Sequence, residues 1–338
     1  MKNVFITGAA GFIGSYVAEE FIRQNWFVTG LMHNRKSEKL ESLTGSGKID
    51  FVNGDIGDFE SLHNALIASG IKYDAIIHCA GRASDVGWKR EFRRTNFDSV
   101  RYLVRLTKKL NIGRFVFVST TDVYGLRDFN CEAENDLKLS ACPKNYYPEF
   151  KILSEQYIQR ELPKERFSII RPAQVWGVGD RTLTARIIDF LKWSPWIVQF
   201  GKWRGKNRWP LAHVRNVAAA TYLAATLHSA SVQAINVVDS EHTCIDDFYR
   251  IIARICLPEK RFKTITLPFW VGYIFGATVS CISKMLNLQV PFIDPSRYAL
   301  YSVSRNLDFS NKKLLALFEK SGRKIISLEE GIQELEQV

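Results

Sequence analysis

Residues 4–14 read Val-Phe-Ile-Thr-Gly-Ala-Ala-Gly-Phe-Ile-Gly, an apolar run that stops at three glycines spaced three residues apart. An apolar helical pattern follows, so the stretch predicts a strand, a tight turn and the start of a helix. Gly8 permits the turn, Gly11 lets a diphosphate approach the backbone, and Gly14 lets the helix pack against the strand. The free amides and positive dipole end of such a helix attract phosphates. We therefore expect a dinucleotide site here, the alternative being a glycine turn without a ligand.

Short apolar runs and helical patterns then alternate through the first half of the chain. Runs rich in β-branched and aromatic residues lie at 26–32, 49–52, 74–79, 114–119 and 168–171, and helical patterns lie at 58–69, 90–110 and 150–161. A further strand is expected at 234–238, after a helical stretch at 214–228. This alternation predicts an α/β fold, a Rossmann-type doubly wound parallel sheet with helices on both faces.

The alternation is interrupted at 178–207 and 240–338. We expect these two segments to form a smaller C-terminal substrate-binding domain, a cap over the carboxyl ends of the strands. Residues 1–177 and 208–239 would then form the dinucleotide-binding domain.

Residues 264–283 carry no charge and are long enough to reach across a bilayer. Pro268, two glycines and several Ser and Thr residues dilute the apolar character, so a buried or interfacial amphiphilic helix is predicted rather than a span. Lys260, Arg261, Lys263 and Lys284 flank the segment and suit contact with anionic lipid. Peripheral membrane contact and a plain buried helix both remain open.

The 338-residue chain has an ordinary globular composition, with 46% hydrophobic and 24% charged residues, but its formal charge is +11. That charge favours an anionic partner, yet the basic residues are scattered, so no specific nucleic-acid binding is expected. Six cysteines occur without a Cys-x-x-Cys pair or a histidine at the spacing of a zinc ligand, which predicts neither a disulfide framework nor a metal site. Because the start also lacks a signal-peptide pattern, we expect a cytoplasmic protein.

Tyr147 and Lys151 are four residues apart, so on a helix they share one face. Pro148 is compatible with that helix only if Tyr147 lies in its first turn. Unit charges about 4 Å apart at an effective dielectric near 20 interact by roughly 4 kcal/mol, which is about three pKa units. Lys151 would thus bring the pKa of the Tyr147 phenol toward neutrality, which suits a general acid or base. Ser119 and Thr120 end an apolar strand, where a hydroxyl would hold a substrate oxygen.

Together these motifs resemble the extended short-chain dehydrogenase/reductase superfamily, that is, the NAD(P)-dependent epimerase/dehydratase family, over nearly the full length. The matching motifs are Thr7-Gly8-x-x-Gly11-x-x-Gly14, Gly54-Asp55, His78-Cys79-Ala80-Gly81, Asn96, Ser119-Thr120, Tyr147-x-x-x-Lys151, Arg171-Pro172 with Gly177, His213-Val214, Asp308-Phe309-Ser310-Asn311-Lys312 and Ser327-Leu328-Glu329-Glu330-Gly331.

The resemblance implies that Tyr147 is the catalytic acid/base, and that Lys151 holds the ribose and lowers the Tyr147 pKa. Thr120, or Ser119 if the alignment slips by one residue, would position the reacting oxygen. The implied coenzyme contacts are Thr7, Gly8, Gly11, Phe12, Ile13, Gly14, His33, Arg35, Asp55, Ile56, Ala80, Gly81, Asn96, Tyr147, Lys151 and Pro172. His78 and His213 are left out of the catalytic set as packing histidines.

The second predicted strand suggests which coenzyme is used. Relatives that prefer NAD end this strand with an acid that accepts hydrogen bonds from the ribose hydroxyls. Here His33, Arg35 and Lys36 follow the strand and no carboxylate does. These residues suit a 2′-phosphate, so we predict NADP over NAD, the alternative being a solvated basic loop.

The predicted cap is rich in aromatic residues. Trp209 stands where sugar-nucleotide enzymes of the superfamily commonly hold an arginine, with Arg204 and Arg208 as the nearest substitutes. Large apolar residues of the cap include Trp193, Trp196, Ile197, Phe200 and Trp203. This composition resembles the 3β-hydroxysteroid dehydrogenase-like branch, which implies an oxidoreductase that interconverts a secondary alcohol and a ketone on an apolar, sterol-like or lipid-derived substrate.

Two other functions remain open, a sugar-nucleotide epimerase or dehydratase and a non-catalytic NADP-binding sensor. A homodimer is common in the superfamily and is expected here.

Overall fold

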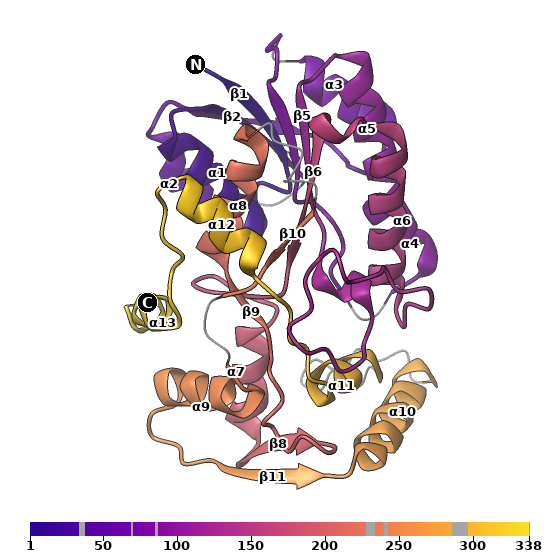
Figure 1. Cartoon of the computed structure of the whole chain (residues 1–338), viewed down its shortest axis with the longest axis vertical. Helices are drawn as coiled ribbons and strands as arrows, with labels where there is room; N and C mark the ends of the chain where they lie inside the picture. Colours follow the sequence, from indigo (N-terminus) through magenta and orange to yellow (C-terminus); the bar gives the residue numbers. More distant parts are fainter. Residues whose placement is uncertain are drawn as a thin grey trace.

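The computed structural model describes residues 1–33, 38–68, 70–84, 87–227, 234–239, 243–285 and 297–337. At its centre lies a seven-stranded parallel sheet (Figure 1). The strands are β1 (Asn3–Thr7), β2 (Phe27–Met32), β3 (Ile49–Asn53), β4 (Ala75–His78), β5 (Arg114–Val118), β6 (Phe167–Pro172) and β10 (Ala234–Val237). Each lies within a residue or so of an apolar run in the sequence, and the predicted α/β fold is confirmed.

The strand order is β10-β6-β5-β4-β1-β2-β3. The chain therefore starts in the middle of the sheet, builds outward to β3, and then crosses to the other side of β1 with β4. The winding direction reverses between β1 and β4, where Thr7 is paired with His78. A doubly wound sheet binds its ligand at the carboxyl ends of the strands at such a point.

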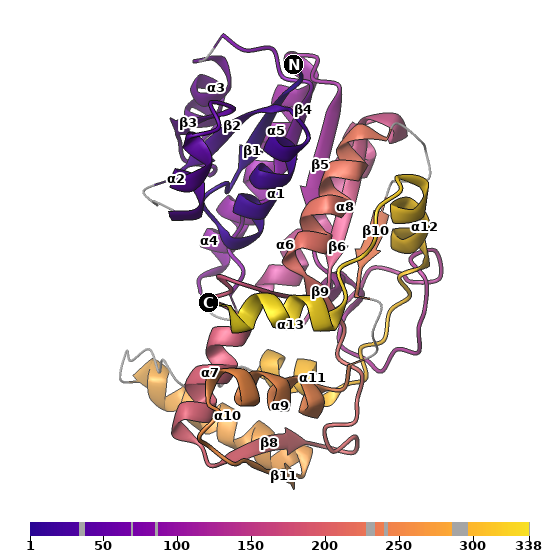
Figure 2. The same cartoon turned by 90° about the vertical axis from the view of Figure 1, so that its left-hand side faces the viewer.

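Helices cover both faces of the sheet (Figures 1 and 2). The first face carries α1 (Phe12–Arg23), α8 (Val214–Thr226) and α12 (Lys312–Lys320), and the second carries α3 (Phe59–Ile67), α5 (Ser99–Lys109) and α6 (Tyr146–Glu161). Successive residues of β1 point to opposite faces, since Val4 and Ile6 join one apolar cluster and Phe5 joins the other. Burial on both faces explains why the strands are almost continuously apolar.

The shorter elements connect this framework. They are α2 (Glu38–Thr44), α4 (Lys89–Arg93), the π-helical turn η1 (Arg94–Asp98), and the 3-10 turns η2 (Thr121–Tyr124) and η3 (Lys164–Arg166). The single helical pattern predicted at 90–110 is thus formed by α4, η1 and α5 in succession.

A second group of elements lies beyond one end of the sheet, in the lower part of Figure 1, and we refer to it as the cap. It comprises α7 (Thr184–Trp193), β8 (Trp196–Phe200), α9 (Ile245–Cys256), β11 (Lys263–Leu267), α10 (Phe269–Met285) and α11 (Arg297–Ser304). Between cap and sheet, β7 (Gln174–Trp176) pairs with β9 (Leu211–His213). Helix α13 (Leu328–Glu336) lies along the same junction (Figure 2).

Two parts of the C-terminal third differ from the sequence expectations. Residues 264–267 belong to β11, which pairs with β8, so only the following residues form the predicted helix, α10. Helix α12 packs against α8 and β10, with Leu314 and Phe318 in an apolar cluster of the sheet, although the predicted division places 240–338 in the cap. Within the described ranges, no helix combines the length and the apolar character that a membrane crossing requires.

Candidate functional site

The glycine turn after β1 forms a cradle that side chains would fill. Gly8 has a φ of +69°, and a Cβ atom there would lie 2.8 Å from the backbone of Ala80. A Cβ atom on Gly14 would overlap the carbonyl oxygen of Gly8. Helix α1 begins after Gly11, which provides no side-chain cap, and its first turn contains no acid. The first amides of α1 therefore retain the capacity to bind phosphate, and this cradle fits a dinucleotide.

His78 joins β1 to β4 beside this cradle. Its Nδ1 atom lies 2.6 Å from the Thr7 hydroxyl, and its Nε2 atom lies 3.3 Å from the Ser99 hydroxyl. The Thr7 hydroxyl also accepts a hydrogen bond from the Ala80 amide at 3.3 Å. Burial, together with the charge of Lys151, lowers the pKa of His78 to about 3. His78 is thus a neutral histidine that holds the two central strands together.

Helix α6 starts where the sequence requires it. Tyr146 is its first residue, and the Asn145 carboxamide accepts a hydrogen bond from the Tyr147 amide at 3.1 Å. Pro148 therefore falls in the first turn, where a missing amide hydrogen costs little. As a result the helix continues undisturbed and carries Tyr147 and Lys151 on one face.

The Lys151 ammonium lies at the end of β5. It donates a hydrogen bond to the Val118 carbonyl at 2.7 Å and lies 5.8 Å from the centre of the Tyr147 ring. Burial lowers the pKa of Lys151 to about 8, and the charges of Cys79 and Glu155 act in the opposite direction. A partly desolvated ammonium at this distance favours the phenolate form of a tyrosine.

The same ammonium lies close to the loop that follows β4. A Cβ atom on Gly81 would lie 3.7 Å from Lys151 Nζ and 3.1 Å from Asn96 Oδ1. Asn96 accepts a hydrogen bond from the Arg82 amide at 2.6 Å and donates one to the Arg82 carbonyl at 3.0 Å. Its own carbonyl accepts a hydrogen bond from Ser154 of α6 at 2.7 Å. Asn96 thus ties the loop after β4 to α6.

Ser119 and Thr120 have different surroundings. The Ser119 hydroxyl donates a hydrogen bond to Glu155 at 2.5 Å, and the fully buried Glu155 carboxylate is paired with Arg171. Thr120 caps the start of η2, since its hydroxyl oxygen accepts a hydrogen bond from the Asp122 amide at 3.2 Å. Ser119 is therefore part of a buried ion-pair network. Sequence reasoning overlooked Glu155, although its spacing of four residues from Lys151 places it on the same face of α6.

Asp55 and Ile56 lie directly after β3. The Asp55 carboxylate accepts a hydrogen bond from the Gly57 amide at 2.8 Å and also binds the Arg94 guanidinium. Ile56 packs against the apolar cluster beneath it. Both residues thus follow the carboxyl end of β3, which is where residues that contact the adenine would have to lie.

The other predicted coenzyme contacts lie at the end of β6 or after β1 and β2. Phe12 and Ile13 form the first turn of α1 and pack against the sheet, and Pro172 is the buried last residue of β6. His33 follows β2 and is exposed. Arg35 lies outside the described residues.

Trp209 is part of the core. It is 4% exposed and packs against the rings of Phe248 and Tyr249, with centroid distances of 6.0 and 6.2 Å. The neighbouring Arg208 donates a hydrogen bond to the Asp308 carboxylate at 2.8 Å. Position 209 therefore carries no positive charge that could bind a diphosphate substrate. The charge of Arg208 is already paired with Asp308.

The remaining large apolar residues of the cap divide between interior and surface. Ile197 is fully buried, and the Trp203 indole donates a hydrogen bond to Asp128 at 3.1 Å. In contrast, Trp193 is 77% exposed and Trp196 is 47% exposed. The aromatic composition of the cap thus does not by itself describe a substrate pocket.

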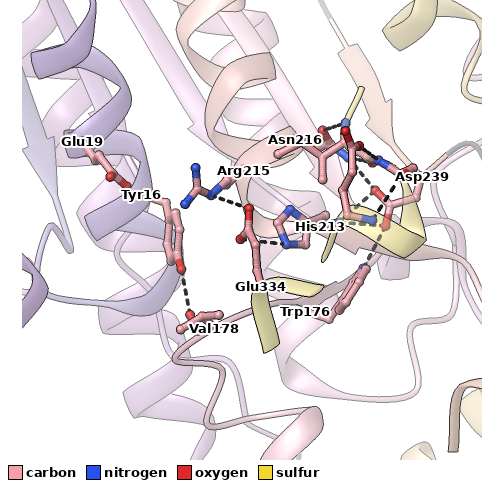
Figure 3. Close-up of polar contacts among 12 residues, drawn as sticks. Tyr16, Glu19, Trp176, Val178, His213, Arg215, Asn216, Asp239 and Glu334 are labelled. Atoms are coloured by element: carbon pink, nitrogen blue, oxygen red, sulfur yellow. Dashed lines mark hydrogen bonds and ion pairs between the residues drawn. The ribbon is translucent and has the colours of Figure 1, made fainter. Parts of the chain in front are cut away.

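A polar joint lies where α13 meets the core (Figure 3). The Asp239 carboxylate accepts hydrogen bonds from the Trp176 indole at 2.8 Å, the His213 amide at 2.8 Å and the Asn216 carboxamide at 2.9 Å. The His213 ring lies 4.9 Å from the Trp176 ring and 3.7 Å from the Glu334 carboxylate. Burial lowers the pKa of His213 to about 4. His213 is thus a neutral histidine packed in this joint.

Comparison with known proteins identifies the family to which this sequence is similar. A model described as the NAD dependent epimerase/dehydratase family matches residues 4–237. Sterol-4-alpha-carboxylate 3-dehydrogenase, decarboxylating, from Mus musculus is 22% identical, over 98% of this chain and 89% of that protein. The terminal R domain from the myxalamid PKS-NRPS biosynthetic pathway superposes with a TM-score of 0.79 at 17% identity, covering 100% of this chain and 90% of that one.

A second solved structure is UDP-glucuronic acid 4-epimerase from Bacillus cereus in complex with UDP-glucuronic acid and NAD. It superposes with a TM-score of 0.70 at 18% identity and covers 99% of both chains. At such identities the solved structures show the fold alone, whereas the family model spans more than half of the sequence. The chain therefore belongs to the NAD-dependent epimerase/dehydratase family, within the extended short-chain dehydrogenase/reductase superfamily, and is an NAD(P)-dependent enzyme of that type.

Proposed function

We propose that the enzyme interconverts a secondary alcohol and a ketone on an apolar substrate, with Tyr147, Lys151 and Thr120 as its catalytic residues. The observation that carries this proposal is the position of the Lys151 ammonium. It lies 5.8 Å from the Tyr147 ring and 3.7 Å from the Cβ position of Gly81. These distances support a site in which a phenol and an amine act beside the coenzyme cradle.

In this proposal each residue has a separate task. When bound, the nicotinamide coenzyme supplies or accepts the hydride. Tyr147 takes the hydroxyl proton during oxidation of the alcohol and returns it to the oxygen during reduction of the ketone. Lys151 favours the phenolate, and its hydrogen bond to the Val118 carbonyl holds the ammonium in place. Thr120 donates a hydrogen bond to the substrate oxygen and so fixes it beside Tyr147.

An apolar substrate is supported by the surroundings of Trp209 and Arg208. The uncharged Trp209 is buried, and Arg208 is paired with Asp308. A substrate diphosphate would have to displace that pair or find another cation. The mouse relative is named for a sterol substrate, and we propose a sterol-like or lipid-derived alcohol for this enzyme as well.

A sugar-nucleotide epimerase or dehydratase is the second candidate, since UDP-glucuronic acid 4-epimerase shares the fold. It would use the same Tyr147 and Lys151, so only the substrate contacts separate the two candidates. A non-catalytic sensor is the third candidate, and the presence of both Tyr147 and Lys151 speaks against it.

A thermal-shift screen separates these candidates. The protein is mixed with NADP or NAD and then with apolar steroids, flavonoid-like ketones or UDP-sugars. We expect the apolar compounds to raise the melting temperature further in the presence of coenzyme, because a ligand that binds only the folded state stabilises it. A shift with UDP-sugars alone would instead favour the epimerase.

We further propose NADP as the preferred coenzyme. His33, Arg35 and Lys36, which follow β2 in the sequence, would bind a 2′-phosphate through charge-assisted hydrogen bonds, each contributing about 1.5–3 kcal/mol. NADP is therefore expected to bind roughly tenfold or more tightly than NAD. Fluorescence titration of both coenzymes measures this, with adenosine 2′,5′-bisphosphate and 5′-AMP as a matched pair of competitors. Tighter binding of NAD, or equal competition by the two nucleotides, would contradict the preference.

We also propose that the cap touches membranes peripherally while the protein itself is cytoplasmic and dimeric. Helix α10 exposes Trp270 (64%), Ile274 (56%), Phe275 (52%) and Ile282 (49%), which we refer to as the α10 face. Exposed Lys260, Arg261 and Lys263 precede it in the chain. An apolar helix face with basic neighbours suits a surface of anionic lipid.

Vesicle co-sedimentation tests the α10 face. The wild-type protein is expected to sediment with phosphatidylserine-containing vesicles more than with pure phosphatidylcholine vesicles, and Ile274→Glu should abolish most of this binding. Leu315→Glu is the matched control, since Leu315 is also exposed (40%) but lies on α12. Equal binding by wild type and Ile274→Glu would exclude this role for α10.

A further inference from the structure

The loop between β3 and α3 is fixed by hydrogen bonds of its own. The Asp55 amide donates a hydrogen bond to the Ser61 hydroxyl at 2.8 Å, and the Asp58 amide donates one to the Asp55 carbonyl at 3.1 Å. Asp58 also caps α3, since its carboxylate accepts a hydrogen bond from the Ser61 amide at 2.7 Å. The Asp55 side chain therefore extends from a fixed backbone at the carboxyl end of β3.

Both oxygens of the Asp55 carboxylate are held. The Oδ1 atom accepts a hydrogen bond from the Gly57 amide at 2.8 Å, and the Oδ2 atom binds the Arg94 guanidinium. Arg94 Nε also donates a hydrogen bond to the Gly57 carbonyl at 3.4 Å. Because the two oxygens are held from different segments of the chain, the orientation of the carboxylate is determined.

Gly57 leaves the space in which the Arg94 side chain lies. A Cβ atom on Gly57 would lie 2.6 Å from Arg94 Cγ and 3.0 Å from Arg94 Cδ. These carbon atoms belong to the stem of the side chain, which a methyl group at position 57 would displace. Arg94 therefore packs directly against the loop that carries Asp55.

Arg94 is the first residue of the π-helical turn η1, and this turn is anchored elsewhere as well. The Asn96 carbonyl accepts a hydrogen bond from Ser154 of α6 at 2.7 Å, and the Asn96 carboxamide binds the backbone of Arg82. Such turns are rare and often lie at functional sites. Arg94 thus reaches the loop after β3 from a support that is fixed to α6.

Stability does not explain the ion pair of Arg94 and Asp55. The Arg94 side chain is 55% exposed and the Asp55 side chain is 31% exposed. At such exposure an ion pair contributes little to the free energy of unfolding, because water screens both charges. The place of the pair indicates another role, since the carboxylate lies directly after β3, where the adenine of the coenzyme is expected.

We propose that Arg94 is a positioning residue that determines which base the coenzyme site accepts. It holds the Asp55 carboxylate in the orientation that accepts the amino group of adenine and excludes a base with a carbonyl oxygen at the same position. This inference rests on the expected contact between Asp55 and the adenine. It does not depend on the substrate or on the choice between NADP and NAD.

The lone pairs of the carboxylate explain the selection. An ionised carboxylate only accepts hydrogen bonds, and its two oxygens offer about four lone pairs. The Gly57 amide occupies one on Oδ1 and Arg94 occupies one on Oδ2, which leaves one on each oxygen for the 6-amino group of adenine. Hypoxanthine carries an oxygen at position 6, and the carboxylate repels it.

Hypoxanthine does carry a proton at the neighbouring N1 atom. A carboxylate that Arg94 holds cannot turn toward that proton, whereas a mobile carboxylate can. Loss of Arg94 would therefore weaken adenine binding, because the carboxylate must then be ordered when the base binds, and it would also relieve the penalty against hypoxanthine.

Coenzyme analogues with hypoxanthine in place of adenine test this selection. Whichever of NADP and NAD binds the wild type more tightly is compared with its hypoxanthine analogue by calorimetric titration. The wild type should bind the adenine form at least about tenfold more tightly, since a hydrogen bond to a charged group is worth roughly that factor. In Arg94→Gln the ratio of the two dissociation constants should fall to within about threefold. A wild type without this preference, or an unchanged ratio in Arg94→Gln, would overturn the proposal.

Arg93→Gln is the matched control. Arg93 precedes Arg94, its side chain is 60% exposed, and it is paired with Asp98 at 3.6 Å. Both variants lose one positive charge at nearly the same place, so a weaker attraction of the coenzyme phosphates lowers the affinity for both analogues alike. The base preference of Arg93→Gln should therefore equal that of the wild type. An equal fall of the ratio in both variants would refute the positioning role.

A double variant shows whether Arg94 acts through Asp55. Asp55→Asn should lose most of the adenine preference, because its carboxamide presents a donor as well as an acceptor. Adding Arg94→Gln should change the ratio no further, since the two residues belong to one interaction. A further loss in the double variant would mean that Arg94 contacts the coenzyme itself, which contradicts the proposal.

These titrations require no turnover, so they separate the inference from the proposed function. If the wild type oxidised no alcohol and Arg94→Gln still lost the adenine preference, the proposed reaction would fail and the role of Arg94 would stand. If the wild type turned over the alcohol and Arg94→Gln kept the preference, only the role of Arg94 would fail.

Discussion

Tyr147→Phe is expected to lower kcat by about 10²–10⁴-fold, the range that a positioned proton donor or acceptor contributes. The substitution removes one oxygen atom and keeps the ring that packs in the first turn of α6. Coenzyme binding should remain within a small factor of wild type, because the glycine turn and Lys151 are untouched. Steady-state turnover and coenzyme titration on the same preparations measure the two effects separately.

Tyr146→Phe is the matched control for this experiment. Tyr146 precedes Tyr147 in the same helical turn, is 40% exposed, and lies beside Lys89 with the ammonium 5.4 Å from its ring. Its hydroxyl has no part in the proposed chemistry, so its loss should leave kcat unchanged. Retained turnover in Tyr147→Phe would end the role proposed for Tyr147.

The largest effect on stability is expected from Arg171→Met. Arg171 is paired with Glu155 in the interior, and it also donates a hydrogen bond to the Tyr124 hydroxyl at 2.7 Å. The substitution leaves the Glu155 carboxylate buried without its cation, which costs about 3–5 kcal/mol in the free energy of unfolding. Urea denaturation followed by circular dichroism measures this loss.

A double variant distinguishes an unpaired charge from a general packing defect. Arg171→Met combined with Glu155→Gln removes both charges, so it should be more stable than Arg171→Met alone. Breaking the exposed pair of Arg160 and Glu161 with Arg160→Gln should change stability very little. A double variant as unstable as the single one would show that the buried charge is not the cause.

The sheet and the coenzyme cradle could be predicted from the sequence because their signals are local. The glycine spacing of residues 8–14 determines the turn between β1 and α1, and the apolar runs match the strands almost residue for residue. Pro148 likewise allowed a helix through Tyr147 and Lys151 only if Tyr147 lay in its first turn. Helix α6 begins at Tyr146, so Tyr147 does lie there. Each of these inferences depends on neighbours in the chain and not on distant contacts.

The remaining features depend on contacts between distant residues. Thr264 to Leu267 form a strand only because β8 lies beside them, so the uncharged composition of 264–283 was misleading there. Trp209 gave no sign of whether it faces a ligand or the core, and the rings of Phe248 and Tyr249 decide that.

The most direct test of the account is to follow the absorbance of free coenzyme while the purified protein is supplied with NADP and an apolar secondary alcohol, with UDP-sugars in parallel. The account predicts that coenzyme is reduced in step with ketone formation and that Tyr147→Phe abolishes this. A protein that keeps NAD tightly bound and epimerises a UDP-sugar, without net reduction of free coenzyme, would contradict it.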